Sequence, residues 1–591
     1  MTWVHGNHTF KFGGSLNLEG FYEDDPDVAL QGQYNFSSAE TAEPYIATIT
    51  GGAGASNIGA YSLGFPYASF LLGAVDHATI NPPSIARYGK YQLGLYAQDS
   101  WKITPKFTLD YGLRYDYSTY YREQYGRSPQ FAPNAPDPAA GGQPGDVIYQ
   151  ATCHCQFAHN YPYGFGPRLG FAYQLSPKTV LRGGFGVVYS GTGSAALFGN
   201  ASGNAAANNP FNPSVPGQPI MYWGQGVTIN GSPITAAQIA WPNFSPSYYP
   251  VGGVVPGTGP QYLDPNAGRP ARQYQYSFTV QREITPNLVV DASYVGNRGI
   301  WWPTYEDEGG LITSGNMVRY NYLSPQLLSH YGLSLSNPAD LTILLAPVGS
   351  PAAGPFMNHI PFAGFPLTAT VAQSLRPFPQ FNAGLNPVAA PLGDTWYNSL
   401  QTTVNKRFSH GLSATGAFTW SKSLNTFAGT PDPENYALAK GISEYNQPFQ
   451  VRMSLSYALP KWGPKIVSYL VRDWTLNAFG DWASGLPLLA PVANTAGYPS
   501  SLASATMANL TFVTNTSPVT ADNQYQIPTG QPFYNVNINC HCFDPNKTIV
   551  LNPAAWANPA PGQYGGAAYY NGFRQQRRPV ENFGIGRTLQ N

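Results

Sequence analysis

The sequence predicts an all-β protein, a transmembrane antiparallel β-barrel of the outer-membrane type, on three observations. Segments of about ten residues or more alternate apolar and polar side chains, which is the period of an extended strand with two different faces. Short turns alternate with long connections along the chain, as they do in outer-membrane barrels. Charged residues make up only 10% of the 591 residues, against about 25% in a typical soluble domain, whereas aromatic residues reach 14%.

The clearest strand is predicted at residues 107–121, where Tyr111 and Leu113 fall on one face and Asp110 and Arg114 on the other. A period of two over this length indicates an extended strand. The same pattern recurs along the chain, and it predicts twelve strands: 9–22, 91–98, 107–121, 165–175, 179–189, 273–284, 288–297, 396–408, 412–424, 449–459, 474–486 and 580–587.

The connections between these strands fall into two classes. Short turns are predicted at residues 103–106, 176–178, 285–287 and 409–411, and a longer turn contains Pro460 and Pro464. The long connections run from about 23–87, 122–164, 190–271, 300–395, 425–447 and 487–574. We expect the short turns to be periplasmic and the long connections to be extracellular. A further crossing at residues 70–79 would invert every later turn, so this stretch is placed within the first outer loop or in a local hairpin there.

Several classes of protein are excluded by composition. Apolar runs such as 341–348 fall well short of the roughly 18 residues that a membrane helix needs. Thirty basic and thirty acidic residues give no net charge and no basic block, so nucleic-acid binding is not expected. No nucleophile with a base, paired-carboxylate motif or phosphate-binding glycine loop occurs in an interpretable context, so neither an enzyme nor a cofactor is expected.

We expect residues 1–591 to form part of one barrel domain. Met1 is followed by Thr2, Trp3, Val4 and His5, without the basic and apolar regions of a signal peptide. An exported protein without these regions is expected to be a fragment. Twelve strands with ragged ends predict an open portion of a barrel, with unpaired edges or a strained closure.

Charged residues on the polar faces of the strands are predicted to face the lumen. An unpaired charge that faces lipid costs about 2–4 kcal/mol at the membrane midplane, so the lumen is their expected place. The favoured alternative to a substrate-specific role is that they are simply solvated. The predicted lumen-facing residues are Asp110, Arg114, Asp116, Arg168, Arg182, Asp291, Arg407, Arg452 and Asp481.

Two Cys-His-Cys triplets in the outer loops are the local motif that could carry chemistry. They are Cys153-His154-Cys155 and Cys540-His541-Cys542. Disulfides between the two loops are favoured, because an extracellular location is oxidising. A soft metal ion held by thiolates and imidazoles is the less favoured alternative, because the spacing matches no standard zinc pattern.

Two aromatic pairs near the loop edges are candidate ligand contacts. Trp301-Trp302 and Tyr248-Tyr249 could stack on sugar rings or other planar ligands. An aromatic girdle at the membrane interface uses the same residues, and it is the favoured interpretation.

Six ordered segments resemble one family, the Oar-like TonB-dependent outer-membrane transporters. They are YAQDSWKITP (96–105), DYGLRY (110–115), GPRLGFAY (166–173), SYVGNRG (293–299), YNSLQ (397–401) and FTWSKSL (418–424). The resemblance implies a bacterial outer-membrane protein with a plug domain, a TonB box and a barrel of about 22 strands. We expect both the plug and the last strands of such a barrel to be missing from these 591 residues.

The resemblance implies uptake of a large or scarce extracellular solute, energised by the TonB complex through the missing plug. The expected partners are outer-membrane lipid, the TonB complex and that solute. An oligosaccharide, a peptide, a siderophore and a metal complex all remain open. The alternative is a surface barrel that acts in adhesion or binding, without energised transport.

Overall fold

The computed structural model describes most of the chain. The described residues are 1–23, 33–41, 64–80, 86–126, 129–190, 209–211, 219–223, 228–229, 232–233, 262–303, 321, 323–381, 387–426, 435–460, 473–492, 525–540, 542–558 and 565–587. Within them, the dominant feature is one 15-stranded sheet.

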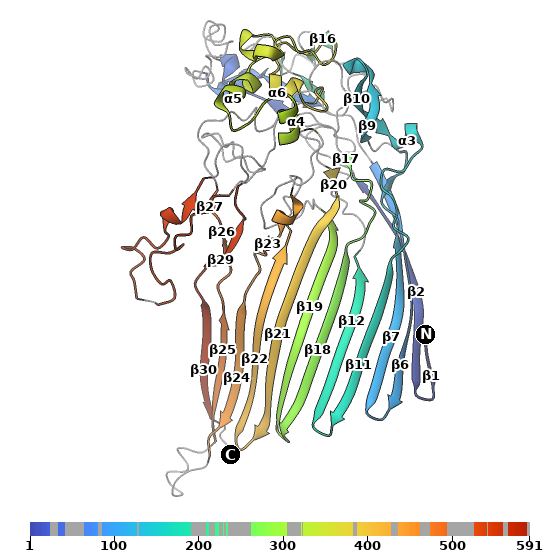
Figure 1. The fold of residues 1–591 in the computed structure, drawn as a ribbon, viewed down its shortest axis with the longest axis vertical. Coiled ribbons are helices and arrows are strands. Elements are labelled where there is room, and N and C mark those ends of the chain that lie inside the picture. Colours follow the sequence, from blue (N-terminus) through green and yellow to red (C-terminus); the bar gives the residue numbers. More distant parts are fainter. Residues whose placement is uncertain are drawn as a thin grey trace.

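The strands of this sheet follow one another in sequence order, each antiparallel to its neighbours (Figure 1). Two short strands lie off the main path: β8 (Arg122–Glu123) pairs with β6, and β23 (Gly441–Ile442) pairs with β22. The main path runs through β1 (Thr2–His5), β2 (His8–Glu23), β6 (Ala86–Thr104), β7 (Phe107–Ser118), β11 (Phe165–Ser176), β12 (Thr179–Tyr189), β18 (Arg272–Thr285), β19 (Leu288–Pro303), β21 (Pro391–Ser409), β22 (Leu412–Asn425), β24 (Phe449–Ala458), β25 (Trp474–Ala483) and β30 (Arg578–Arg587).

All twelve predicted strands are confirmed. Strand β1 was missed, because four residues before a turn carry too little alternation to be recognised. The turn at 409–411 has positive φ at His410 (52°) and Gly411 (80°), as a two-residue hairpin turn of type I′ requires. The tight turns of the sheet lie at one end, and the long connections leave from the other (Figure 1).

The sheet is open in the described part of the chain. Strands β1 and β30 lie at its two edges, and each pairs with one neighbour, β2 and β25 respectively. The predicted unpaired edges are therefore present.

The described residues of the first long connection contain no further crossing of the sheet, as the parity of the turns predicts. It forms α2 (Pro66–Leu72), β4 (Ala74–Val75) and β5 (His77–Ile80). In the described part of the chain these strands pair with other loop strands: β5 with β3 (Gln33–Asn35) and β13 (Asn209–Phe211), and β4 with β14 (Met221–Tyr222). The placement in an outer loop is confirmed, although residues 66–72 are helical.

The connection between β19 and β21 folds into a small helical unit, which we call the helical cap (residues 323–381). It contains α4 (Pro325–His330), α5 (Pro338–Leu345), the 3₁₀ helix η9 (Pro351–Phe356) and α6 (Val371–Ser374). Its core includes Leu328, Leu344 and Val348, each at most 1% exposed. Side chains cap its helices: Ser324 Oγ accepts from the Leu327 amide, at 3.1 Å.

One other outer loop is held against the helical cap, and a second is held against the first. The hairpin of β9 (Pro129–Asp137) and β10 (Gln143–Tyr149) receives two hydrogen bonds from Gln380 Nε2, to the carbonyls of Pro144 and Gly145, both at 2.9 Å. Gln130 in turn bonds both the amide and the carbonyl of Leu263 at 2.8 Å, which ties in the loop between β12 and β18. Three long connections thus form one folded assembly beyond the sheet (Figure 1).

Smaller elements complete the outer loops. They are η1 (Ala39–Thr41), η4 (Pro138–Ala140), α3 (Gln150–Cys153), β15 (Thr228–Ile229), β16 (Ser232–Pro233), β17 (Tyr262–Leu263), β20 (Pro387–Val388), η10 (Tyr436–Ala439), β26 (Pro487–Leu489), β27 (Ile527–Pro528), η11 (Pro553–Ala555), β28 (Trp556–Ala557) and β29 (Tyr569–Arg574). None of the helices described is long and apolar enough to cross a membrane.

One face of the sheet exposes large apolar side chains along its whole width. Leu16 is 67% exposed, Leu113 48%, Leu169 51% and Leu400 41%. A patch this wide would drive aggregation of a soluble protein, whereas it suits contact with lipid. We call this the apolar face, and the opposite one the polar face.

Candidate functional site

The nine charged residues predicted to line a lumen all lie on the polar face. Arg168 lies opposite Gly112 in the ladder, and Arg452 lies opposite Asp481. Because side chains alternate with a period of two, the ladders between the other strands carry the same face across the sheet. They place on it Asp110, Arg114, Asp116, Arg182, Asp291 and Arg407.

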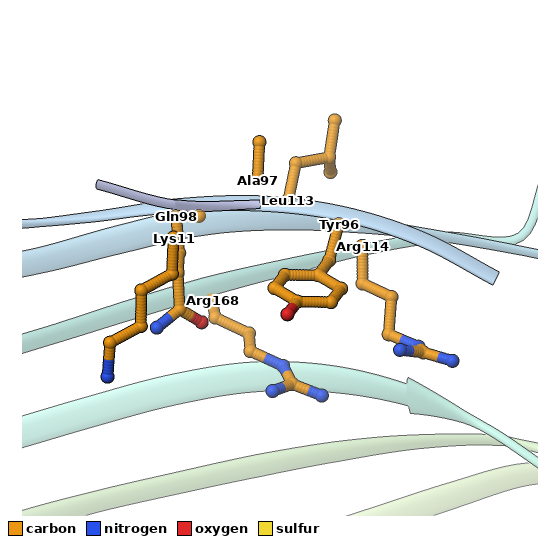
Figure 2. Close-up of a pocket in the computed structure, with 8 residues that line it drawn as sticks. Lys11, Tyr96, Ala97, Gln98, Leu113, Arg114 and Arg168 are labelled. Carbon is orange, nitrogen blue, oxygen red and sulfur yellow. The ribbon is translucent and has the colours of Figure 1, made fainter. Parts of the chain in front are cut away.

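A pocket of about 290 Å³ lies over β2, β6, β7 and β11 on this face. Figure 2 shows Lys11, Tyr96, Gln98, Arg114 and Arg168 on the same side of the sheet. The side chains of their sequence neighbours Ala97 and Leu113 point to the opposite side (Figure 2). Three cations thus line one pocket. Arg114 is neutralised by Asp116, at 2.8 Å.

Glycine makes room for the Arg114 side chain. A Cβ at Gly94, the residue opposite Asp116, would come within 2.6 Å of Arg114 Nη2 and 2.9 Å of Ser15 Oγ. A larger residue at this position would displace the guanidinium. Glycines placed among the charged residues therefore leave space for long charged side chains in this part of the polar face.

A second and larger pocket, of about 720 Å³, lies over β11, β12, β18 and β19. Gly184 and Gly186 form part of its floor, where the absence of side chains hollows the sheet. Uncharged polar groups surround this floor, among them Gln275, Ser277 and Asn297. Arg168 lines both pockets, so the two depressions adjoin one another on the polar face.

The other predicted residues are spread along the face. Arg452 Nε lies 3.1 Å from Asp481 Oδ2 in an ion pair. Asp291 Oδ1 is buried without a hydrogen-bond partner. Arg182 is opposite Ala172 and Thr279, and Arg407 is exposed near the turn at 409–411. The nine residues therefore share a face without converging on one centre.

A charged cluster that was not predicted from the sequence lies on the polar face near the outer loops. Lys90 Nζ lies 3.3 Å from Glu19 Oε2 and 4.2 Å from the centre of the Tyr121 ring, and Lys90 is only 5% exposed. The Tyr121 hydroxyl donates to Glu19. Extending the alternation of residues 91–98 toward the N-terminus would have identified Lys90.

The two Cys-His-Cys triplets form disulfides within each triplet, Cys153 with Cys155 and Cys540 with Cys542. The predicted pairing between the two loops is wrong. The Cα atoms within each triplet are 5.1 Å apart, which is within the range that a disulfide spans, so each triplet closes on itself. His154 is exposed, and His541 lies outside the described residues. Among the residues described, no group of three or more His, Cys, Asp or Glu is arranged to hold a metal ion.

The two predicted tryptophans lie at the outer end of β19. The Trp301 ring meets Tyr161 edge-on, with 5.5 Å between ring centres, and the Trp302 indole covers Gly299. Tyr248 and Tyr249 lie outside the described residues. A girdle or ligand role for these four residues stays a prediction.

Comparison with known proteins identifies the family. The model of the outer membrane beta barrel domain family matches residues 1–590. A search of the curated proteins found no match. Among solved structures, the chain is similar to the outer membrane transporter YddB from Escherichia coli, with 10% identity and a TM-score of 0.38, covering 84% of this chain and 42% of that one.

Two further solved structures show the same kind of similarity. The ferripyoverdine receptor of Pseudomonas aeruginosa has 10% identity and a TM-score of 0.32, covering 83% of this chain and 37% of that one. The FrpB iron transporter of Neisseria meningitidis has 8% identity and a TM-score of 0.32, covering 82% of this chain and 41% of that one. This chain spans less than half the length of these structures. The match to the family model over nearly every residue shows that the chain belongs to the outer membrane beta barrel domain family and is a protein of the bacterial outer membrane.

Proposed function

We propose that this chain is part of the wall of a TonB-dependent transporter, not an enzyme, and that the intact protein imports a large or scarce solute across the outer membrane. The observation that carries the proposal is the polar face with its two adjoining pockets. A barrel that only anchors adhesive surface loops would not need a polar face with pockets along its strands.

The pockets lie on the polar face below the folded outer loops. The 720 Å³ pocket offers amide and hydroxyl groups from Gln275, Ser277 and Asn297, with Arg168 at its edge. Such groups hydrogen-bond to sugars, peptides and chelates alike, so they suit a hydrated passage more than one tight binding site. The helical cap and the β9–β10 hairpin would form the capture surface above this passage.

The test fills the larger pocket. Gly184 lies on its floor, and a Cβ there would meet Ser277 Oγ at 3.6 Å and the carbonyl oxygen of Leu169 at 3.9 Å, which are ordinary van der Waals distances. Gly184→Trp in the full-length protein should therefore narrow the passage without disturbing the sheet. The matched control is Phe185→Trp, because Phe185 is the next residue along β12, on the apolar face and 41% exposed.

Uptake of labelled oligosaccharides, peptides and ferric chelates would be measured in cells that express the protein. We expect at least one solute whose uptake requires both this protein and the inner-membrane TonB complex. Gly184→Trp should lower that uptake several-fold, and Phe185→Trp should not change it. Uptake that persists without the TonB complex, or surface binding without any uptake, would favour the adhesion alternative and contradict the proposal.

A further inference from the structure

Two arginines lie near the outer end of β18: Arg272 in the strand itself, and Arg269 in the loop that precedes it. Arg272 is the first residue of the strand, and it lies opposite Tyr189 and Ile300. The period of two places it on the same face as Phe278 and Val280, which are 45% and 37% exposed. Because the long extracellular loops leave from this end, Arg272 lies where the lipid-facing surface meets the outer loops.

Both guanidinium groups lie over the same tryptophan ring. Arg272 Cζ lies 4.1 Å from the centre of the Trp301 ring, and Arg269 Cζ lies 4.7 Å from it. Trp301 has φ of 65°, an uncommon conformation for a bulky residue. It lies in a bulge: two residues of β19 separate Gly299 from Trp302, whereas one residue of β21 separates their partners Thr395 and Gly393. A bulge redirects a side chain, and here it turns Trp301 toward the arginines on the apolar face.

The segment that carries Arg269 is also fixed in place. The amide of His159 donates to the carbonyl of Pro265 at 2.8 Å, and the Arg269 amide donates to the carbonyl of Asn266 at 2.8 Å. The chain that follows His159 supplies Tyr161, whose ring meets Trp301 edge-on. The two cations thus belong to a built cluster of aromatic and basic side chains.

These two arginines have no acidic partner in the described part of the chain. The side chains of Arg269 and Arg272 form no ion pair or hydrogen bond with the described residues, and Nε of Arg272 is buried without a hydrogen-bond partner. Both guanidinium groups lie within 5 Å of the centre of one ring, so their charges repel each other, and partial burial makes the unneutralised charge costly. An anion that contacts both groups would remove both penalties.

A neighbouring arginine on the same face provides the contrast. Arg298 stacks on Trp396, with its Cζ 3.9 Å from the ring centre, as Arg272 stacks on Trp301. Arg298 is neutralised within the chain by Asp394, at 2.9 Å, and it also bonds the carbonyl of Gly299. The two sites thus share the Arg–Trp stack, but only one of them has its counter-charge in the described chain.

We propose that Arg269 and Arg272, with Trp301, bind the phosphate group of a lipid in the outer leaflet of the outer membrane. Guanidinium groups form paired hydrogen bonds to phosphate, and aromatic rings settle at the level of lipid headgroups. The apolar surface below the site, with Phe278 and Val280, would lie against the acyl chains of the same lipid. Acyl contact distinguishes a lipid from a free anion.

The test measures lipid binding to the full-length protein in neutral detergent by native mass spectrometry. The probes are dioleoyl phosphatidic acid, dioleoyl phosphatidylcholine with the same acyl chains, and inorganic phosphate. We expect phosphatidic acid to bind at least about tenfold more tightly than phosphatidylcholine, a ratio that two charge-assisted hydrogen bonds can supply. The double variant Arg269→Gln/Arg272→Gln should lose this preference.

The control variant is Arg298→Gln, which removes a cation from the same face but one that Asp394 already neutralises. It should keep the preference for phosphatidic acid. Arg272→Lys, which keeps the charge but loses the planar pair of donors, should keep part of it, and heat-dependent migration in gels would confirm that every variant is folded. A double variant that still prefers phosphatidic acid would overturn the proposal. So would an equal loss in Arg298→Gln, or competition by inorganic phosphate at the same concentration as the lipid.

Discussion

Glu40, in the first outer loop, is a carboxyl group whose protonation is coupled to the folding of that loop. Its Oε2 accepts from the amide and the hydroxyl of Ser37, at 3.2 and 3.0 Å. Burial, followed by a hydrogen bond with the side chain of Asp76, raises the pKa of Glu40 from 4.5 to about 7. Asp76 is contacted in turn by His77 Nδ1, at 2.9 Å. The proton on Glu40 therefore helps to hold residues 37–41 against β5.

The raised pKa sets the direction of a pH dependence. The folded loop binds the Glu40 proton more tightly than the unfolded loop, so this contribution is complete below about pH 4.5 and is lost as the pH rises through about 7. Amide hydrogen exchange of residues 37–41, corrected for intrinsic rates, should show several-fold lower protection above pH 7 than near pH 5. Glu40→Gln should remove this difference, and a difference that persists in the variant would contradict the assignment.

Asp99 is a charged residue whose position the alternation of apolar and polar side chains does not explain. Asp99 lies on the apolar face, although a charge there is normally unfavourable. The structure makes it tolerable, because His8 Nδ1 lies 2.6 Å from Asp99 Oδ2 and the Tyr111 hydroxyl donates to the same oxygen at 3.1 Å. These partners come from β2 and β7. Their proximity depends on the register between strands, which one sequence does not reveal.

At the scale of elements, the contact between the helical cap and the β9–β10 hairpin depends on a few buried side chains. Gln380 is fully buried and donates to two carbonyls of the hairpin. The Phe131 ring lies edge-on to Phe378 and Phe381, with 4.9 and 5.9 Å between ring centres. Polar and aromatic contacts together fix one outer loop against another.

Replacing Gln380 should loosen this contact without affecting the wall. Gln380→Ala removes both donors and leaves two carbonyls without partners, at a cost of about 1–3 kcal/mol. The amides of β10 should then exchange faster, while those of β7 and β11 keep their protection. Thr342→Ala is the matched control, because Thr342 is in the same helical cap and its hydroxyl donates to the nearby carbonyl of Pro338, within the cap itself. Equal effects of the two variants would mean that Gln380 does not join the loops.

The strands could be predicted from the sequence, but the outer loops could not. Each of the twelve predicted strands repeats a pattern of period two, as Leu109, Tyr111 and Leu113 do in β7, so a local signal suffices. The contact of Gln380 with Pro144 joins residues 236 positions apart, and no local pattern encodes it. The polar face of the candidate site followed from the strands, whereas the two pockets depend on which glycines lie side by side.

At the scale of the whole molecule, the two faces of the sheet are expected to meet different surroundings. Leu400 and Gln401 are consecutive residues near the middle of β21. Leu400 lies opposite Tyr294 and Trp420 on the apolar face, whereas Gln401 lies opposite Ser293 and Thr419 on the polar face. The same substitution at both positions therefore compares lipid with the interior of the barrel at a single depth.

We expect Leu400→Arg to lower the free energy of unfolding in phospholipid vesicles by about 2–4 kcal/mol, because its charge would lie near the membrane midplane. Gln401→Arg should change it by only about 0.5 kcal/mol, because its side chain joins an already polar and hydrated surface. Reversible denaturant titration of the full-length protein, followed by tryptophan fluorescence, would measure both. Costs of similar size at the two positions would show that both faces meet the same medium. The strands would then form a sheet that does not separate lipid from water.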